Sequence, residues 1–584
     1  MRAGLDKTAL ALALLAGCCG FIASALLAWL LGAALNGWLG IGFAVLAAGA
    51  SLRLGGASWR AAVQGVVLVL AAGAATAFAG QFIIDLSVDT QQYHQQAIML
   101  MSQGWNPLHE PQSPLRNVST LWVDGYAKTH WIYAALLMDL GVGIEAGKSF
   151  SWMLALASGL LVHALLTERL GWSRRAAAVV TVIVILNPVF SCQWQTLLND
   201  QMLAFTLLLA LASLAWAAGA QDLPQRRRRA GLLVAVSFAL LVAIKASGVA
   251  YAGLFVLLTL PLLAWGWGRA AALRMGAWAV LGSVLGVLTL GFNPYVTNTV
   301  LHGHPFYPLA GEGKVDIITG NAPAGVLEHS RAVKLFGSLA ARSSSTIGGP
   351  APVPPTLAPK VPGSVSMAEL KSFMTKNDTR IAGFGPWFSL ALLASIAGAA
   401  WAWRRRLRSG WHRGLLVLPS VLLLASALAF PEPWWARYVP QVWLIPMVVA
   451  IALITLGRRE GDAAQRRVGW GVVAISAVNA ALVALLSIAG SIPRQADLRA
   501  QLDSLRLLSQ EQPLLMDFGP APAAALMLDR AGVRWKEASG GEACTDPASW
   551  VYVEYTFVHV CLDRSQRAGF VNASPWIAAL KARL

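Results

Sequence analysis

The chain has 584 residues, of which 57% are hydrophobic and only 12% are charged, and its formal net charge is +17. Soluble domains carry about 25% charged residues, so this composition excludes an ordinary soluble protein. The positive charge does not indicate a nucleic-acid partner, because the arginines fall in short clusters between apolar runs, where they set orientation in a membrane.

Apolar runs long enough to cross a bilayer, about 17 to 25 residues, recur along the chain. The first run is expected to be a retained helix, because it is longer and more apolar than a cleaved signal and lacks a clear cleavage site. We predict a polytopic α-helical membrane protein with about thirteen transmembrane helices. The predicted helices cover residues 9–34, 39–53, 61–80, 150–166, 176–191, 201–218, 231–246, 249–268, 276–291, 386–403, 414–430, 439–457 and 468–490.

The arginine clusters predict how these helices are oriented. With a cytoplasmic N-terminus, strict alternation places nearly every arginine cluster in a cytoplasmic loop. These clusters lie at 53–60, 169–175, 226–229, 269–274, 404–413 and 458–467. We interpret the arginines as orienting the protein, with contact to anionic lipids as the alternative. The same alternation sends the long polar segments to the periplasmic side.

The polar segments divide the chain into three predicted regions. Residues 1–60 hold two additional N-terminal helices, and residues 61–490 form the transmembrane core. That core includes a first large periplasmic loop at 81–148 and a second at 293–384. Residues 491–584 mix helical and strand-like runs, which predicts a small periplasmic α/β domain. Within it, Cys544 and Cys561 could pair if the segment is extracytoplasmic.

Ionisable groups crowd the first large loop. Asp85, Asp89, Tyr93 and His94 follow the apolar helix 61–80 within a few residues, and Lys128 and His130 close the same loop. Charged groups at the mouth of a membrane helix cost desolvation energy unless they are paired or hydrated, so they are functional candidates. The alternative for each carboxylate is a solvated loop position or a helix cap.

Three further polar features fall on the same predicted side of the membrane. Asn199-Asp200 precedes the helix at 201–218, where Asp200 could equally be an N-cap. Lys245 interrupts an apolar run, and a lysine in such a place must pair or extend to the surface. Arg437-Tyr438 stands at the mouth of a late helix.

In order and spacing from Ala61 to Leu456, these motifs resemble the GT-C superfamily of polyprenyl-phosphate-sugar-dependent glycosyltransferases. The likeness is to its protein O-mannosyltransferase and lipid A aminoarabinose transferase branch. It rests on Asp-x-x-x-Tyr after an early helix, a lysine closing the same loop, Asn-Asp, an intramembrane Lys-x-x-Gly and a late Arg-Tyr. The chain departs from that branch in its two preceding helices, in Thr90 where a second acidic residue is frequent, and in its C-terminal domain.

The resemblance implies an inverting transfer of a sugar from a polyprenyl-phosphate donor. We expect Asp89 to be the catalytic base, with Asp85 as the second candidate, because a partly desolvated carboxylate can be tuned to take a hydroxyl proton. Cations should hold the donor phosphate, and we assign this role to Lys128, Lys245 and Arg437. The residues expected to contact substrate are Tyr93, His94, His130, Asp200 and Tyr438.

The sequence thus predicts a GT-C-like glycosyltransferase of the bacterial inner membrane, with a lipid-linked glycan or surface polysaccharide as acceptor. No zinc-ligand spacing is present, no cofactor is assigned, and participation of a divalent cation is left open. One alternative is a flippase or transporter of lipid-linked sugars, although no internal repeat supports it. Another is a polysaccharide polymerase or ligase that uses the same carriers.

Overall fold

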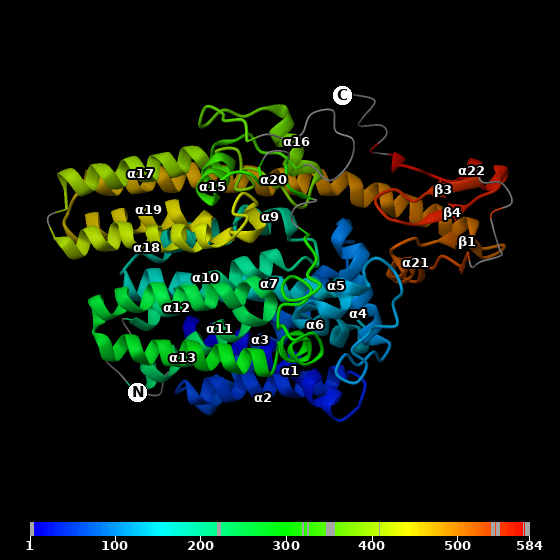
Figure 1. Ribbon diagram of the computed structural model, residues 1–584, viewed down its shortest axis with the longest axis horizontal. Coiled ribbons are helices and arrows are strands. Elements are labelled where there is room, and N and C mark those ends of the chain that lie inside the picture. The colour runs from blue at the N-terminus through cyan, green and yellow to red at the C-terminus, as the bar shows by residue number, and fades with distance from the viewer. Residues whose placement is uncertain are drawn as a thin grey trace.

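The computed structural model describes residues 5–218, 224–317, 321–323, 326–345, 357–407, 409–538, 544, 549–575 and 577. Its long helices run side by side along the long axis of the molecule (Figure 1). Within the described residues, ten helices are long and apolar enough to cross a membrane. The predicted class, a polytopic helical membrane protein with a small C-terminal sheet domain, is confirmed.

A helix overlaps each of the thirteen predicted spans. They are α1 (Lys7–Leu30), α2 (Gly37–Leu54), α3 (Trp59–Gly80), α7 (Ser149–Ala164), α8 (Arg174–Ile185), α10 (Asp200–Ala218), α11 (Pro224–Ile244), α12 (Ala246–Trp267), α13 (Arg269–Leu288), α17 (Phe388–Arg405), α18 (Gly410–Ala429), α19 (Leu444–Arg459) and α20 (Ala463–Leu508). The ten long apolar helices do not include α8, α11 and α17. Helix α8 has 12 residues, which cover only about 18 Å. The count of thirteen therefore stays a prediction.

The first helix is largely enclosed by its neighbours in the bundle. Most of α1 is buried, and it packs against α2, α3, α7 and α11. Its approach to α2 is close at Gly20, where an added Cβ would lie 2.5 Å from the carbonyl oxygen of Phe43. The two N-terminal helices are thus part of the core packing rather than an appendage to it.

Short helices of the two large loops cover one end of the bundle. The first loop contains η1 (Thr90–His94), α4 (Gln95–Ser102), α5 (Thr120–Gly125), α6 (Thr129–Asp139) and η2 (Ile144–Lys148). The second contains η4 (Phe292–Val296), α14 (Thr297–His302), α15 (Arg331–Ala340) and α16 (Met367–Thr375). Near α19 the chain forms η6 (Ala436–Tyr438) and η7 (Pro440–Trp443). Another short helix, α9 (Pro188–Gln193), precedes α10.

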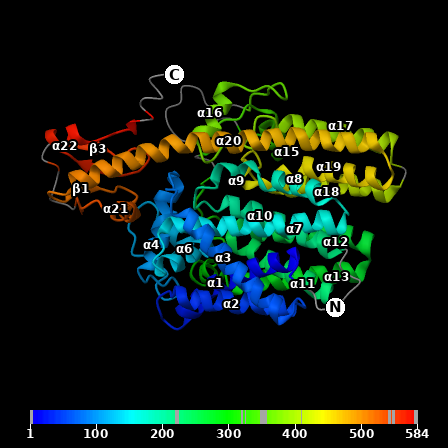
Figure 2. The same cartoon turned by 180° about the vertical axis from the view of Figure 1, so that it is seen from behind.

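Helix α20 connects the bundle to the C-terminal domain (Figure 1 and Figure 2). Its 46 residues extend about 69 Å, and it crosses the predicted boundary at residue 491 without a break. The domain is a four-stranded sheet of order β2-β1-β4-β3. Its elements are β1 (Leu514–Asp517), α21 (Ala525–Arg530), β2 (Trp535–Glu537), β3 (Trp550–Tyr552), β4 (His559–Cys561) and α22 (Arg564–Gly569). Strand β1 pairs parallel with β2 and antiparallel with β4, and apolar residues of α20 complete the core.

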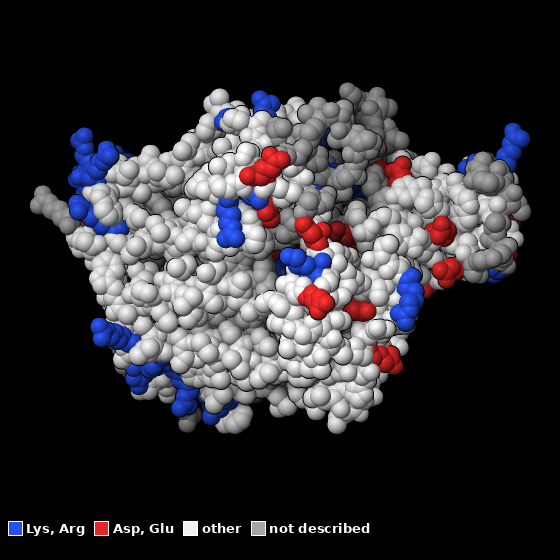
Figure 3. Space-filling model, in the orientation of Figure 1, with Lys and Arg blue, Asp and Glu red and all other residues white. Residues whose placement is uncertain are grey.

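Charge is distributed unevenly along the molecule (Figure 3). On the face shown, a group of lysines and arginines lies at the end opposite the C-terminal domain, whereas the aspartates and glutamates lie mainly from the middle to the other end, together with further lysines and arginines. This arrangement agrees with the predicted one-sidedness of the arginine clusters. Which end faces the cytoplasm stays a prediction.

The predicted pairing of Cys544 with Cys561 is confirmed, with the two Cα atoms 5.8 Å apart. The bond closes a loop between residues 17 positions apart. In the chain-entropy description, a loop of this size contributes about 3 kcal/mol to stability.

We expect a Cys544→Ser/Cys561→Ser protein to lose this contribution and to be cut faster in its C-terminal domain by added protease. The control is Cys192→Ser, which removes a buried cysteine with no disulfide. Equal cleavage rates in the paired-cysteine variant and the wild type would contradict the expected stabilisation.

Candidate active site

A single arginine lies at the centre of the charged groups on the loop-covered end. Nη1 of Arg437, in η6, lies 3.3 Å from Asp89, 3.7 Å from Asp200 and 3.5 Å from Asp378. We call these four residues the arginine–aspartate cluster. Burial alone would lower the pKa of Arg437, but the three carboxylates outweigh burial and hold its pKa well above the usual value. The guanidinium is therefore charged at every physiological pH.

Asp200 is held on several sides. It lies at the start of α10, where a negative charge is favoured by the helix dipole. Lys245 forms an ion pair with it, and Gln193 Nε2 donates to its carboxylate at 3.3 Å. Lys245 occupies the extended break between α11 and α12. The lysine that interrupts an apolar run thus pairs with a carboxylate, as the cost of burying an ammonium group requires.

Aromatic rings lie within cation–π distance of the cations of this site. The ring centroid of Tyr438 lies 4.8 Å from Lys245 Nζ, and that of Trp435 lies 4.1 Å from the guanidinium carbon of Arg437. These are distances at which ring faces attract cations. Tyr438, predicted to contact substrate, therefore lies beside both cations of the site.

Asp378 belongs to the cluster but was not predicted from the sequence. Trp435 Nε1 donates to its two carboxylate oxygens at 2.9 and 3.1 Å, and Arg380 Nε lies 3.7 Å away. Burial raises the pKa of Asp378, although Arg437 opposes this shift. The only sequence signal is an acidic residue in a polar stretch on the correct side of the membrane. Its pairing with Arg437 depends on the folded second loop.

Asp89 is the most accessible of the three aspartates. Its side chain is 37% exposed, against 3% for Asp200 and 14% for Asp378. In the described structure its carboxylate has one partner, Arg437 Nη1. Of the three, this carboxylate alone combines solvent access with few existing bonds.

Neutral aromatic groups lie next to the charges. His94 Nδ1 accepts a hydrogen bond from Trp131 Nε1 at 2.7 Å and lies 2.9 Å from His130 Nε2. Because Trp131 can only donate, His94 Nδ1 carries no proton and His130 must be the second donor. Burial lowers the pKa of His94 well below its usual value and that of His130 to about 3. The ring centroid of Tyr93 lies 4.3 Å from that of His94, so this wall of the site is polar but uncharged.

Two predicted site residues, Asp85 and Lys128, have hydrogen-bond partners away from the arginine–aspartate cluster. Asp85, the second candidate for the base, is buried and accepts hydrogen bonds from Ser87 N at 2.9 Å, Ser87 Oγ at 2.7 Å and Leu197 N at 2.6 Å. Burial and the nearby carboxylate of Glu145 raise its pKa to about 6. Its oxygens are occupied in joining the first loop to the segment before α10, which indicates a structural role.

The side chain of Lys128 likewise has its hydrogen-bond partners outside the arginine–aspartate cluster. Its Nζ is buried and donates to the carbonyl oxygens of Asp124 at 2.8 Å and Tyr126 at 3.2 Å. Burial lowers its pKa to about 7. In this structure Lys128 therefore closes the first loop around its own carbonyl groups, and the expected contact with a donor phosphate stays a prediction.

The carboxylates of the site are not arranged as metal ligands. Across the part of the chain that the structure describes, no group of three or more His, Cys, Asp or Glu residues could hold a metal ion. In the cluster, the position between the three aspartates is taken by the guanidinium of Arg437.

Comparison with known proteins gives one family match. Residues 146–295 match the dolichyl-phosphate-mannose-protein mannosyltransferase family, a range that contains Asp200 and Lys245. No curated protein matches the chain. The family match confirms the resemblance to the GT-C superfamily predicted from the sequence.

Two solved structures are similar to the chain. ArnT from Cupriavidus metallidurans in the apo state is 16% identical, with 82% of this chain and 87% of that chain covered and a TM-score of 0.41. The same protein bound to undecaprenyl phosphate is 16% identical, with 85% and 98% covered and a TM-score of 0.38.

The contrast between Asp85 and Asp89 can be tested by stability alone. Asp85→Ala leaves the buried Leu197 N–H without an acceptor and should cost about 3 kcal/mol, measured as a lower Tm in detergent. Asp89→Ala, at a more exposed position with one partner, should change the Tm much less. Equal losses for the two variants would contradict the structural role of Asp85.

Proposed function

We propose that this chain, a membrane glycosyltransferase of the GT-C superfamily, moves a sugar from a polyprenyl-phosphate donor to a hydroxyl group of an extracytoplasmic acceptor with inversion. The observation that carries the proposal is the contact between the accessible carboxylate of Asp89 and the guanidinium of Arg437. A base and a phosphate-binding cation are thereby held side by side, as this transfer requires.

Arg437 is the proposed anchor for the donor phosphate. Its Nη1 atom faces the three aspartates, whereas its Nε–H is buried and has no hydrogen-bond partner in the described structure. An unpaired buried donor costs free energy, and a phosphate oxygen would satisfy it. Lys245 supplies a second positive charge beside Tyr438.

The charges of the site are balanced before substrate binds. Asp89, Asp200 and Asp378 are offset by Arg437, Lys245 and Arg380. A donor phosphate adds negative charge, so it must draw Arg437 or Lys245 away from a carboxylate. Asp89 is the carboxylate most easily released, because Arg437 is its only partner in the described structure.

Once it is released from Arg437, Asp89 is proposed to act as the base. The acceptor oxygen attacks the anomeric carbon, the bond from that carbon to the phosphate oxygen breaks, and the acceptor proton passes to the carboxylate of Asp89. Polyprenyl phosphate leaves with its new charge stabilised by Arg437 and Lys245. The neutral wall of Tyr93, His94 and His130 is proposed to contact the sugar without adding charge.

We place the site on the periplasmic side of a bacterial inner membrane, with the N-terminus cytoplasmic. The disulfide of the C-terminal domain supports this placement, because such bonds persist in oxidising compartments. The proposed acceptor is a lipid-linked glycan or surface polysaccharide. A divalent cation, if one takes part, must compete with Arg437 for the same carboxylates, and transfer rates before and after EDTA treatment test its participation.

We expect Asp89→Asn to lower the transfer rate by about 10²- to 10⁴-fold without changing the Tm, because the amide cannot take a proton. The assay follows release of the carrier from a radiolabelled polyprenyl-phosphate sugar by the purified protein. Glu110→Gln, an exposed amide substitution in the same loop, should retain the wild-type rate. Full activity in Asp89→Asn would refute the assigned base, and transport of the intact lipid without carrier release would indicate a flippase.

Arg437→Lys keeps the charge but loses the planar fork that can grip two phosphate oxygens. We expect kcat/KM for the donor to fall by about tenfold or more, with a rise in KM. The matched control is Arg331→Lys, an exposed position on α15. A donor KM equal to that of the wild type would argue against phosphate binding by Arg437.

A further inference from the structure

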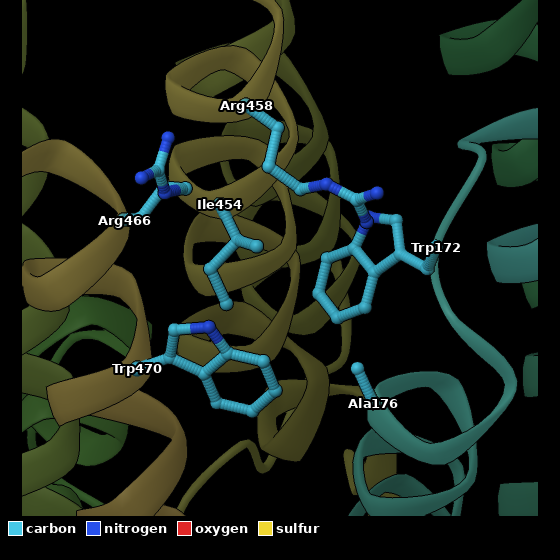
Figure 4. A pocket seen from close by; sticks show the side chains of 6 residues that line it. All are labelled: Trp172, Ala176, Ile454, Arg458, Arg466 and Trp470. Atoms are coloured by element: carbon cyan, nitrogen blue, oxygen red, sulfur yellow. The ribbon is translucent and has the colours of Figure 1, made fainter. Parts of the chain in front are cut away.

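A cavity of about 410 Å³ lies at the end of the bundle opposite the active site (Figure 4). It is formed by the last turns of α19, the first turns of α20, the loop before α8, and the first turn of α8. Its lining residues are Trp172, Ala176, Ile454, Arg458, Arg466 and Trp470. This is an unusual combination of two arginines and two tryptophans around an apolar floor.

The cavity is separate from the arginine–aspartate cluster. Arg437 lies just before α19, whereas Ile454 and Arg458 lie near the other end of that helix. The 16 residues of α19 extend about 24 Å. A phosphate bound by Arg437 therefore cannot reach the guanidinium of Arg458, and any anion in the cavity would be a separate ligand.

Both arginines retain unused hydrogen-bond donors. Arg458 Nη2 donates to Gly171 O at 2.8 Å, and Arg466 Nη1 donates to Gly457 O at 3.3 Å. These bonds fix the side chains and leave other N–H groups of each guanidinium available. Within the described residues, neither arginine forms an ion pair with a carboxylate.

The two acids next to the turn between α19 and α20 already have basic partners. Glu460 lies 2.9 Å from His412 Nδ1, and Asp462 lies 3.4 Å from Arg406 Nε. The cavity therefore presents two positive charges without a paired negative charge, which favours an anion.

The walls favour an amphiphile over a free anion. Trp172 is buried and donates to Thr455 Oγ1 at 3.0 Å, and its ring lies 6.0 Å from that of Trp470. Figure 4 shows the two indoles on either side of Ile454, with the guanidinium of Arg466 on the side of Trp470 and that of Arg458 beside Trp172. Indole rings are common where lipid headgroups meet acyl chains.

We propose that this cavity binds the phosphate group of an anionic membrane phospholipid, with Arg458 and Arg466 holding the phosphate oxygens and the indoles contacting the glycerol and first acyl carbons. Basic pockets between transmembrane helices recognise such headgroups. The site would anchor the α19–α20 turn to the leaflet at the arginine-rich end. It is independent of the donor carrier.

The test uses native mass spectrometry of the full-length protein, titrated with phosphatidylglycerol, with phosphatidylcholine of the same chains, and with inorganic phosphate. We expect Arg458→Gln/Arg466→Gln to weaken phosphatidylglycerol binding by about tenfold, because two charge-assisted contacts are lost. The control, Arg459→Gln/Arg467→Gln, removes the same charge from adjacent positions outside the cavity. It should bind within about twofold of the wild type.

Three outcomes decide whether the cavity binds a phospholipid. Selective loss of phosphatidylglycerol binding in the cavity variant supports the lipid site. Equal losses in the cavity variant and its control would mean that general surface charge attracts the lipid, and would overturn the proposal. Inorganic phosphate that binds the wild type with lipid-like affinity, while the two lipids do not differ, would overturn the lipid assignment in favour of a soluble phosphate ligand.

Discussion

The interaction on which the site depends is the contact of one buried guanidinium with three carboxylates. Removing an arginine from water costs several kcal/mol, and the attraction of Asp89, Asp200 and Asp378 must repay that cost. These residues come from the first loop, the start of α10, the second loop and η6. The cluster therefore forms only when both large loops have folded against the membrane core, which couples formation of the site to formation of the fold.

In the proposed mechanism, the same ion pairs give the site two states. Without substrate, Arg437 is neutralised by carboxylates of the protein, and in the donor complex it would also bind the donor phosphate. The two partners compete for the same donor groups, so binding of the donor would release the base when the base is needed. The more buried aspartates have additional partners in Lys245, Trp435 and Arg380, which hold them in place while Asp89 is free to move.

Much of this arrangement is predictable from the sequence. The apolar runs locate the helices, and the sidedness of the polar residues is enough to assign Asp89, Asp200, Lys245, Arg437 and Tyr438 to one end of the bundle. The hydrogen-bond partners of Asp85 and Lys128 are not predictable, because a sequence shows the charge of a residue but not the backbone groups that it contacts. Asp378 is missed because its partner Trp435 is supplied by a segment 57 residues away, and the residues around Asp378 do not indicate that contact. Burial and hydrogen-bond partners, which the sequence does not reveal, decide between a structural and a functional carboxylate.

The most direct measurement is an experimental structure of the full-length protein with polyprenyl phosphate bound. The account predicts phosphate oxygens within hydrogen-bond distance of Arg437 Nε, and an Asp89 carboxylate that has separated from Nη1 and faces the space beside the phosphate. A bound phosphate remote from Arg437, with all three aspartates still on the guanidinium, would contradict the central claim.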